Sequence, residues 1–277
     1  MALIEIISNK YVLNNKKKFN NNNIWVDNKR PENYTKNNDR YQTKNWIDSF
    51  LNYTKISFEN FTWLKEIRKI YMLTNKISTN YNDEIKEFIQ TLNDQYKNIF
   101  NNRKYHIRTD HHSLKSSKFG LIFYDNFYDI IISLITCSET HVGFLLKDQI
   151  INLYFIDWVQ IDKFKEFRVF IKDYKIMAIS QQYIYEPNKW FQHKSIPFMT
   201  EQMNKIIKYF DQNIKNKLMD ISISDTSLDI AFVNDNLYMI ELNPFGKEYS
   251  SGSALFNWID DYDKLYTNNE INCRITL

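Results

Sequence analysis

Two pairs of strand-like runs, each pair joined by a short polar turn, most constrain the fold of this chain. The four runs are residues 166–171, 176–183, 227–233 and 237–243. Runs of β-branched and aromatic residues that flank a short polar turn are typical of antiparallel β-hairpins. Parallel strands would need a longer crossover, usually a helix, between the two members of a pair. We therefore expect antiparallel sheets.

Helical patterns precede the first hairpin and separate it from the second. Apolar residues recur at intervals of three and four in residues 85–99, 127–135 and 203–214, which predicts three amphipathic helices. Shorter apolar runs predict strands at residues 104–109 and 150–159. The order is not one of repeated β-α-β units, and no glycine-rich first turn is present among only four glycines. The expected fold class is α+β.

We expect three segments along the 277 residues. Residues 1–44 form a polar N-terminal segment rich in Asn and Lys, and residues 45–103 form a helical region. Residues 104–277 would form the domain that carries a functional site. Because residues 14–44 show hardly any apolar periodicity, they are predicted to be an exposed, partly disordered loop.

The bulk composition excludes several classes of protein. Lys and Arg total 36 against 33 Asp and Glu, so the net charge of +3 gives no support to a nucleic-acid partner. Two cysteines are too few for a disulfide framework, which favours a reducing location such as the cytoplasm. The sequence has neither a secretory signal nor an apolar run near the ~20 residues that cross a bilayer, so no membrane partner is expected.

The second hairpin carries the best candidate site. If its turn contains three residues, Asp229 lies directly opposite Glu241, and Asn243 follows on the same face. If its turn contains two, Asp229 lies opposite Ile240 and Glu241 points to the other face. A three-residue turn commonly ends in a left-handed residue, a conformation that asparagine tolerates. Asn236 therefore favours the longer turn.

Two carboxylates on one face, with β-carbons roughly 5 Å apart, repel each other unless a cation lies between them. With the amide oxygen of Asn243 they form an all-oxygen set that suits magnesium. Magnesium is commonly held by one or two carboxylates and by the phosphates of a substrate. The set therefore implies a bound nucleotide, and the alternative is a solvent-facing hairpin with ordinary surface acids.

Five segments together resemble the motif series of the cell division cycle protein 123 family, which belongs to the ATP-grasp superfamily. They are residues 166–171 (EFRVFI), 178–181 (AISQ), 229–232 (DIAF), 241–246 (ELNPFG) and 255–258 (LFNW). The resemblance covers roughly residues 104–265. It implies an ATP-grasp-like fold with the nucleotide site between two subdomains. By similarity, Asp229, Glu241 and Asn243 hold the magnesium ion of bound ATP.

The resemblance also implies partners for the phosphates. Arg108 and Lys115 fall where the family has an arginine followed by a Ser-Pro-Lys element, although Leu114 replaces the proline. Arg168 lies on the same strand face as Glu166, which would fix its guanidinium as a donor fork for phosphate oxygens. The alternative for Arg168 is a structural ion pair with Glu166 or another neighbour.

For the base, Ile156, Asp157 and Val159 resemble the hinge strand against which adenine lies in ATP-grasp proteins, although such a sequence also occurs in ordinary strands. A glycine-rich flap is not visible. Residues 250–253 (SSGS) are either a loop over the phosphates or a plain surface turn.

Two functions share this site. The resemblance implies an assembly factor, or chaperone, that binds ATP and magnesium and docks on the gamma subunit of translation initiation factor 2. The alternative is an ATP-grasp carboxylate–amine ligase that acts through an acylphosphate, with Arg168 and Lys115 as catalytic electrostatic partners. A third reading, a scaffold with a decayed site, predicts no ATP binding.

Overall fold

The computed structural model describes residues 2–20, 38–249 and 251–277. The chain divides into unit 1, Met1–Tyr41 with Gln160–Leu277, and unit 2, Gln42–Val159. This division differs from the expected boundaries at residues 44 and 103, because the first strand of the chain pairs with the last and brings both ends into one unit. Most of the loop expected at residues 14–44 lies outside the described residues.

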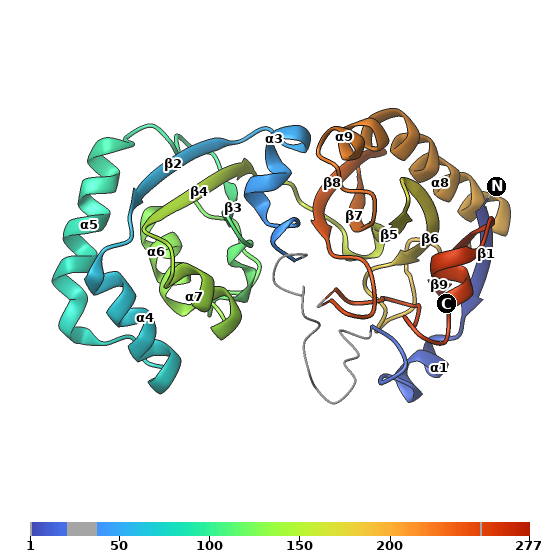
Figure 1. Cartoon of the computed structure of the whole chain (residues 1–277), viewed down its shortest axis with the longest axis horizontal. Coiled ribbons are helices and arrows are strands. Elements are labelled where there is room, and N and C mark those ends of the chain that lie inside the picture. The colour runs from blue at the N-terminus through green and yellow to red at the C-terminus, as the bar shows by residue number, and fades with distance from the viewer. Residues whose placement is uncertain (1, 21–37, 250) are drawn as a thin grey trace. The chain divides into compact units, whose positions relative to one another are not determined.

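Unit 1 is built on a six-stranded sheet with the order β1-β9-β6-β5-β7-β8 (Figure 1). Its strands are β1 (Ala2–Ile7), β5 (Glu166–Lys172), β6 (Lys175–Gln181), β7 (Thr226–Val233), β8 (Asn236–Asn243) and β9 (Ile271–Thr276). β5–β6 and β7–β8 are the two predicted hairpins, and β5 and β7 also pair antiparallel. The β1–β9 and β6–β9 pairs are parallel. The expected α+β class with antiparallel hairpins is confirmed.

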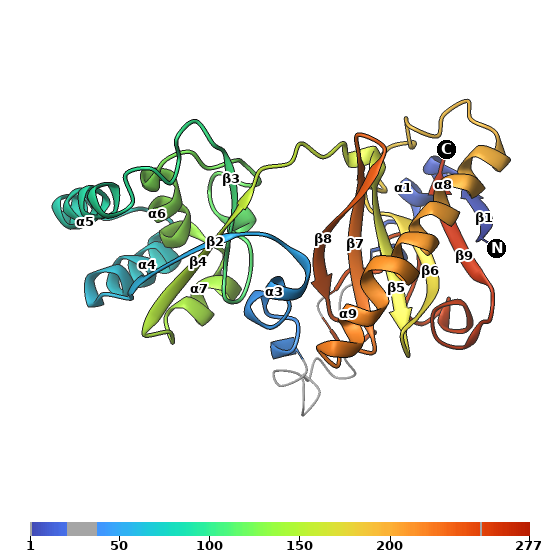
Figure 2. The ribbon, with the colours of Figure 1, turned by 90° about the horizontal axis from the view of Figure 1, so that it is seen from above.

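Helices cover one face of this sheet. α8 (Ile196–Tyr209) continues through a π-helical turn (Phe210–Ile214) into α9 (Lys215–Asp220), and these helices lie along the sheet in both ribbon views (Figures 1 and 2). The expected third helix thus begins earlier than its apolar stripe, at a Ser195 cap whose hydroxyl accepts from the Phe198 backbone N–H. Its buried face includes Met199, Met203 and Ile206.

The segment after β8 covers the opposite face. Its side chains pack on β5 and β6 as an apolar cluster of Phe170, Ala178, Phe245, Phe256, Trp258 and Leu265. Phe170 meets the rings of Phe256 and Trp258 edge to face, with ring centroids 5.5 and 5.4 Å apart. Among the described residues, unit 1 also has the short helix α1 (Asn9–Asn14) and helical turns at Lys163–Lys165 and Asp263–Thr267.

Unit 2 contains a three-stranded antiparallel sheet with the order β2-β4-β3. The strands are β2 (Thr54–Glu59), β3 (Tyr105–Thr109) and β4 (Ile150–Asp157). The helices are α3 (Ile47–Phe50), α4 (Thr62–Thr74), α5 (Asn82–Gln95), α6 (Phe127–Thr136) and α7 (Glu139–Leu145), with 3-10 turns at Thr43–Asn45, Thr79–Tyr81 and Leu114–Ser116. The two helices and two strands predicted in this region are therefore confirmed.

The core of unit 2 lies between its sheet and α6. Ile151, Leu153 and Phe155 alternate along β4 and pack in one cluster with α6 residues such as Ile131 and Leu134. In the described part of the chain, no helix is both long and apolar enough to cross a membrane.

Candidate functional site

The β7–β8 hairpin places Asp229 opposite Glu241, but its turn is not the three-residue turn that was expected. The turn contains only two residues, Asn234 and Asp235, with φ angles of 48° and 62°. Two consecutive residues with positive φ are typical of a type I′ turn, which matches the twist of a hairpin. The prediction of a three-residue turn is therefore wrong.

A β-bulge restores the pairing that a two-residue turn alone would have lost. Ile230 pairs with Met239, whereas the adjacent Asp229 pairs with Glu241, so Ile240 is an extra residue on β8. A bulge of this kind shifts the register of one strand by one position. Glu241 is thereby returned to the same face as Asp229.

Both acids belong to a row of polar side chains that crosses the whole sheet. Directly paired residues project from the same face, and the pairings continue from strand to strand. From β1 to β8 the row consists of Glu5, Arg274, Ser180, Arg168, Asp229 and Glu241. This is the face covered by the segment after β8.

Arg168 and Asp229 form a buried, two-pronged ion pair. Nε of Arg168 donates to Oδ1 of Asp229 at 2.8 Å, and Nη2 donates to Oδ2 at 2.7 Å. The two side chains are only 7% and 2% exposed. Burial by itself lowers the pKa of Arg168, but the negative charges of Asp229, Glu241 and Glu166 outweigh burial and raise the pKa above its ordinary value. Arg168 is therefore a fixed cation whose ion-pair partner is Asp229.

The remaining guanidinium nitrogen of Arg168 contacts the segment after β8. Nη1 donates to the Gly252 carbonyl oxygen at 2.6 Å and to the Ser251 hydroxyl at 3.4 Å. The indole N–H of Trp258 donates to the Ser251 carbonyl oxygen at 3.3 Å. Because Ser251 is only 5% exposed, the described part of the serine–glycine segment is not a plain surface turn.

Asn243 and Ser227 adjoin the ion pair at the end of β8. The side-chain amide of Asn243 donates to Oδ2 of Asp229 at 3.0 Å. Ser227 pairs with Asn243 across the hairpin and is fully buried, yet its hydroxyl has no hydrogen-bond partner in the structure. A buried hydroxyl without a partner is costly and marks a position for water or a ligand atom.

These residues fit a magnesium ion that shares its coordination with phosphates. Carboxylate and amide oxygens are the ligands that magnesium prefers, and Asp229, Glu241 and Asn243 supply them. Oδ2 of Asp229 already accepts from Arg168 and Asn243, whereas Oδ1 accepts from Arg168 alone and keeps a lone pair. Within the described ranges no three acidic, histidine or cysteine side chains gather closely enough to hold a metal alone. A cation here would complete its coordination with oxygens from water or from a bound molecule.

The other five candidates lie in unit 2. Arg108 on β3 and Ile156 on β4 share the sheet face that points away from the core of that unit. Arg108 is buried; its Nε donates to the Thr43 hydroxyl at 3.0 Å, and its guanidinium lies 5.1 Å from the Trp46 ring centroid. Arg108 is thus held rigidly within its own unit.

Asp157, Val159 and Lys115 are less enclosed. Asp157 ends β4 and forms an exposed ion pair with Arg103 at 2.6 Å, and Val159 is the last residue of unit 2. Lys115 is exposed in the 3-10 turn that follows β3. The four candidates of unit 1 form one cluster, and the contribution of the five in unit 2 to the same site stays a prediction.

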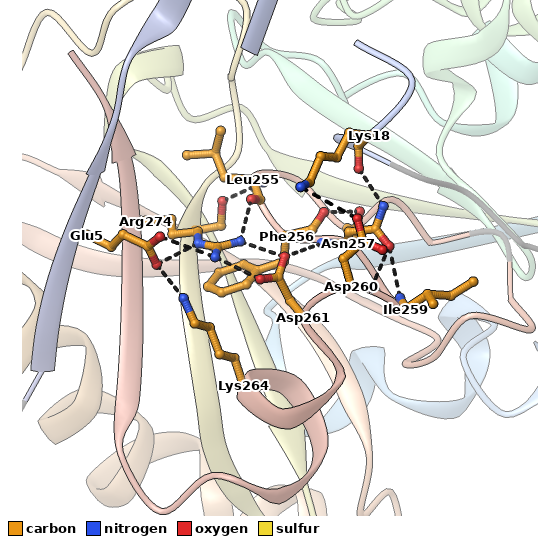
Figure 3. A network of polar contacts seen from close by, with 12 residues as sticks. Glu5, Lys18, Leu255, Phe256, Asn257, Ile259, Asp260, Asp261, Lys264 and Arg274 are labelled. Carbon is orange, nitrogen blue, oxygen red and sulfur yellow. Dashed lines mark hydrogen bonds and ion pairs between the residues drawn. The ribbon is translucent and has the colours of Figure 1, made fainter. Parts of the chain in front are cut away.

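Arg274, the second buried arginine of the polar row, was not predicted from the sequence (Figure 3). Arg274 donates to both carboxylate oxygens of Asp261, at 2.6 and 2.8 Å, and to both of Glu5, at 2.8 and 3.3 Å. It also donates to the Leu255 carbonyl oxygen at 3.1 Å and lies 4.4 Å from the Phe256 ring centroid. Burial lowers its pKa, but the two carboxylates raise it above the ordinary value. Arg274 therefore anchors the segment after β8.

Comparisons with known proteins agree with this architecture. A family model described as D123 matches residues 134–276. A Candida albicans protein named "Translation initiation factor eIF2 assembly protein" is 32% identical over 115 residues. That match covers 41% of this chain and 31% of the relative, so it spans less than a third of the relative's length.

Two solved structures share the fold. Cdc123 from Schizosaccharomyces pombe has a TM-score of 0.62 at 17% identity, over 88% of this chain and 98% of that one. A C-terminally truncated form of it has a TM-score of 0.60 at 16% identity, with the same two coverages. The family model covers more than half of the 277 residues and agrees with the motif series. The chain belongs to the D123 family, that of cell division cycle protein 123.

Proposed function

We propose that this protein binds ATP together with magnesium and acts in the assembly of translation initiation factor 2. The observation that carries the proposal is the cluster of Arg168, Asp229, Glu241 and Asn243 in a chain of the D123 family. It combines a fixed cation with carboxylate and amide oxygens on one sheet face, which is the chemistry that a metal–phosphate complex requires.

In this proposal Asp229, Glu241 and Asn243 hold the magnesium ion, which offsets the negative charge of the phosphates. The Ser227 hydroxyl offers a further oxygen, for a water molecule beside Asn243. Of the five N–H donors of Arg168, four are directed at Asp229, Ser251 and Gly252. Arg168 therefore acts on the phosphates mainly through its charge.

By the family resemblance, we expect the remaining contacts to come from the other five candidate residues. Arg108 and Lys115 would meet phosphate oxygens, and Ile156, Asp157 and Val159 would lie against the adenine. The alternation of β4 supports this in part, since Ile156 and Arg108 lie on one face of the sheet.

The partner follows from the relative and the family together. The Candida albicans relative is named as an assembly protein for initiation factor 2. The family resemblance implies docking on the gamma subunit of that factor. Magnesium–ATP would then order the protein for docking.

The first test is calorimetric titration of ATP, with and without magnesium, into the wild type, Asp229→Asn and Asp235→Asn. Asp235 is the matched control, because it is an exposed acid in the turn of the same hairpin. We expect Asp229→Asn to lose at least about tenfold in magnesium-dependent affinity, the size of one charge-assisted contact, and Asp235→Asn to match the wild type. Equal affinity and magnesium dependence for all three proteins would refute the metal assignment.

The second test is retention of purified initiation factor 2 gamma subunit by the immobilised protein with magnesium–ATP. We expect retention by the wild type and weaker retention by Asp229→Asn, without ATP turnover. No retention under any nucleotide condition would contradict the assembly role while leaving ATP binding intact. Release of ADP and phosphate only when a carboxylate and an amine are both supplied would indicate the ligase reaction instead.

A further inference from the structure

We propose that Arg168 makes this site selective for the magnesium–nucleotide complex over the free cation. The inference rests on the proposed function, since it concerns the same site, but it adds a property that magnesium–ATP binding alone does not imply. It assigns to one buried side chain the requirement that metal and phosphate bind together.

The first step is electrostatic. The guanidinium of Arg168 contacts both carboxylate oxygens of Asp229, at 2.8 and 2.7 Å, so the negative charge of this acid is already neutralised. In a buried site such a pair is weakly screened by solvent. A free divalent cation that approaches Asp229 therefore meets a neutral pair and the repulsion of the guanidinium.

The side chain of Arg168 cannot move aside to make room for a cation. Its side chain is 7% exposed, and its Nη1 donates to Gly252 at 2.6 Å. Ser251, which accepts a second bond from Nη1, is in turn bound by the Trp258 indole. Displacing the guanidinium would leave a buried cation without its carboxylate and would release this segment, so a cation must bind beside Arg168.

The triphosphate of ATP reverses this electrostatic balance. Its several negative charges are attracted both by the cation and by Arg168, so the arginine that repels the free cation stabilises the complex. Oδ1 of Asp229 retains a lone pair for the metal while the ion pair stays intact. Linkage then requires ATP to raise the affinity for magnesium by the same factor as magnesium raises the affinity for ATP.

The test compares magnesium alone with magnesium–ATP, by calorimetry, in wild type, Arg168→Gln, Arg168→Lys and Arg274→Gln. Arg168→Gln removes the charge, and Arg168→Lys keeps the charge without the fork. Arg274→Gln is the matched control, because Arg274 is another buried arginine of the same row with a two-pronged carboxylate pair that does not involve Asp229.

We expect Arg168→Gln to bind free magnesium about tenfold or more tightly than the wild type and magnesium–ATP about tenfold or more weakly. Arg168→Lys should stay near the wild type for free magnesium, and Arg274→Gln should leave the ratio of the two affinities unchanged. If Arg168→Gln fails to fold, the wild type alone still tests the inference. Magnesium affinity that is the same without ATP as with it would overturn the inference.

The outcomes separate the two claims. Wild-type binding of magnesium–ATP combined with unchanged or weaker binding of free magnesium by Arg168→Gln would overturn the inference and leave the proposed function standing. Absence of binding of both probes to the wild type would overturn both.

Discussion

Removing the carboxylate of Asp229 is expected to destabilise unit 1 by about 3–5 kcal/mol, the usual cost of leaving one partner of a buried ion pair alone. The side chains of Arg168 and Asp229 are 7% and 2% exposed, so solvent cannot compensate for the loss. In Asp229→Ala, Nε and Nη2 of Arg168 lose their acceptors, and the Asn243 amide loses its acceptor as well.

The size of the effect can be worked out from the contacts. The two Arg168 bonds to Asp229 are charge-assisted and worth about 1.5–3 kcal/mol each, so together they are of the same size as the expected loss. Asp229→Asn keeps one acceptor oxygen but loses the charge, so it should cost about 2 kcal/mol. In the double variant Arg168→Met/Asp229→Ala no buried charge is left alone, and the cost should fall about 2 kcal/mol or more below the sum of the single costs.

Urea unfolding monitored by hydrogen exchange of the β5 and β7 amides measures these costs in unit 1 separately from unit 2. The same measurement shows what fraction of Asp229→Asn is folded in the ATP titration. A cost below about 1 kcal/mol for Asp229→Ala, or additive costs in the double variant, would refute the buried ion pair.

Three further predictions address other buried or charged groups. Cys137 and Cys273 are buried, and burial raises the pKa of both thiols, that of Cys137 to about 12. A thiol reagent at pH 8 should therefore label neither cysteine until the protein unfolds. Rapid labelling of the folded protein would contradict this burial. Arg68 is fully buried, burial lowers its pKa to about 10, and its Nε and Nη2 have no partner in the structure. Arg68→Met should therefore be neutral or stabilise unit 2 by about 1–2 kcal/mol, and a loss above about 2 kcal/mol in urea unfolding would show that these nitrogens are paired. Burial raises the pKa of Glu5, but its basic partners Arg274 and Lys264 outweigh burial and lower the pKa below 4.5. Glu5→Gln should therefore be less stable than the wild type at pH 7, and the difference should shrink as the pH falls below 4.5. An unchanged difference in the free energy of unfolding at pH 3 would contradict this.

The β7–β8 hairpin shows which part of the site could be predicted from sequence. The face that Glu241 occupies depends on the combined number of turn and bulge residues, and an odd total places it opposite Asp229. A three-residue turn and a two-residue turn with one bulge give the same total. The pairing of Asp229 with Glu241 was thus predictable from the sequence. The bulge at Ile240 was not, because no local residue pattern along β8 distinguishes an extra residue from a regular one.

Long-range pairing limited the prediction of the domains and of the polar row. In unit 2, β3, β4, α5 and α6 follow from local periodicity, and their bounds lie within a few residues of those expected, whereas β2, α3, α4 and α7 were not predicted. The Glu5–Arg274 pair joins positions 269 residues apart, and no local pattern reports such a contact. The same pairing of β1 with β9 sets the division into units.

Arg168 and Arg274, the two buried arginines of the polar row, differ in their surroundings although they lie on the same face of the sheet. Arg274 is held by the carboxylates of Glu5 and Asp261, and no buried side-chain atom of these three residues lacks a partner in the structure. Beside Asp229, by contrast, the buried Ser227 hydroxyl has no partner, although it lies on the same face. A polar network that satisfies all its own atoms stabilises the fold, whereas one that leaves a buried oxygen unpaired has a position for another molecule. The row is therefore fully paired at Arg274, and the unpaired Ser227 hydroxyl at its β7–β8 end supports the ligand site proposed there.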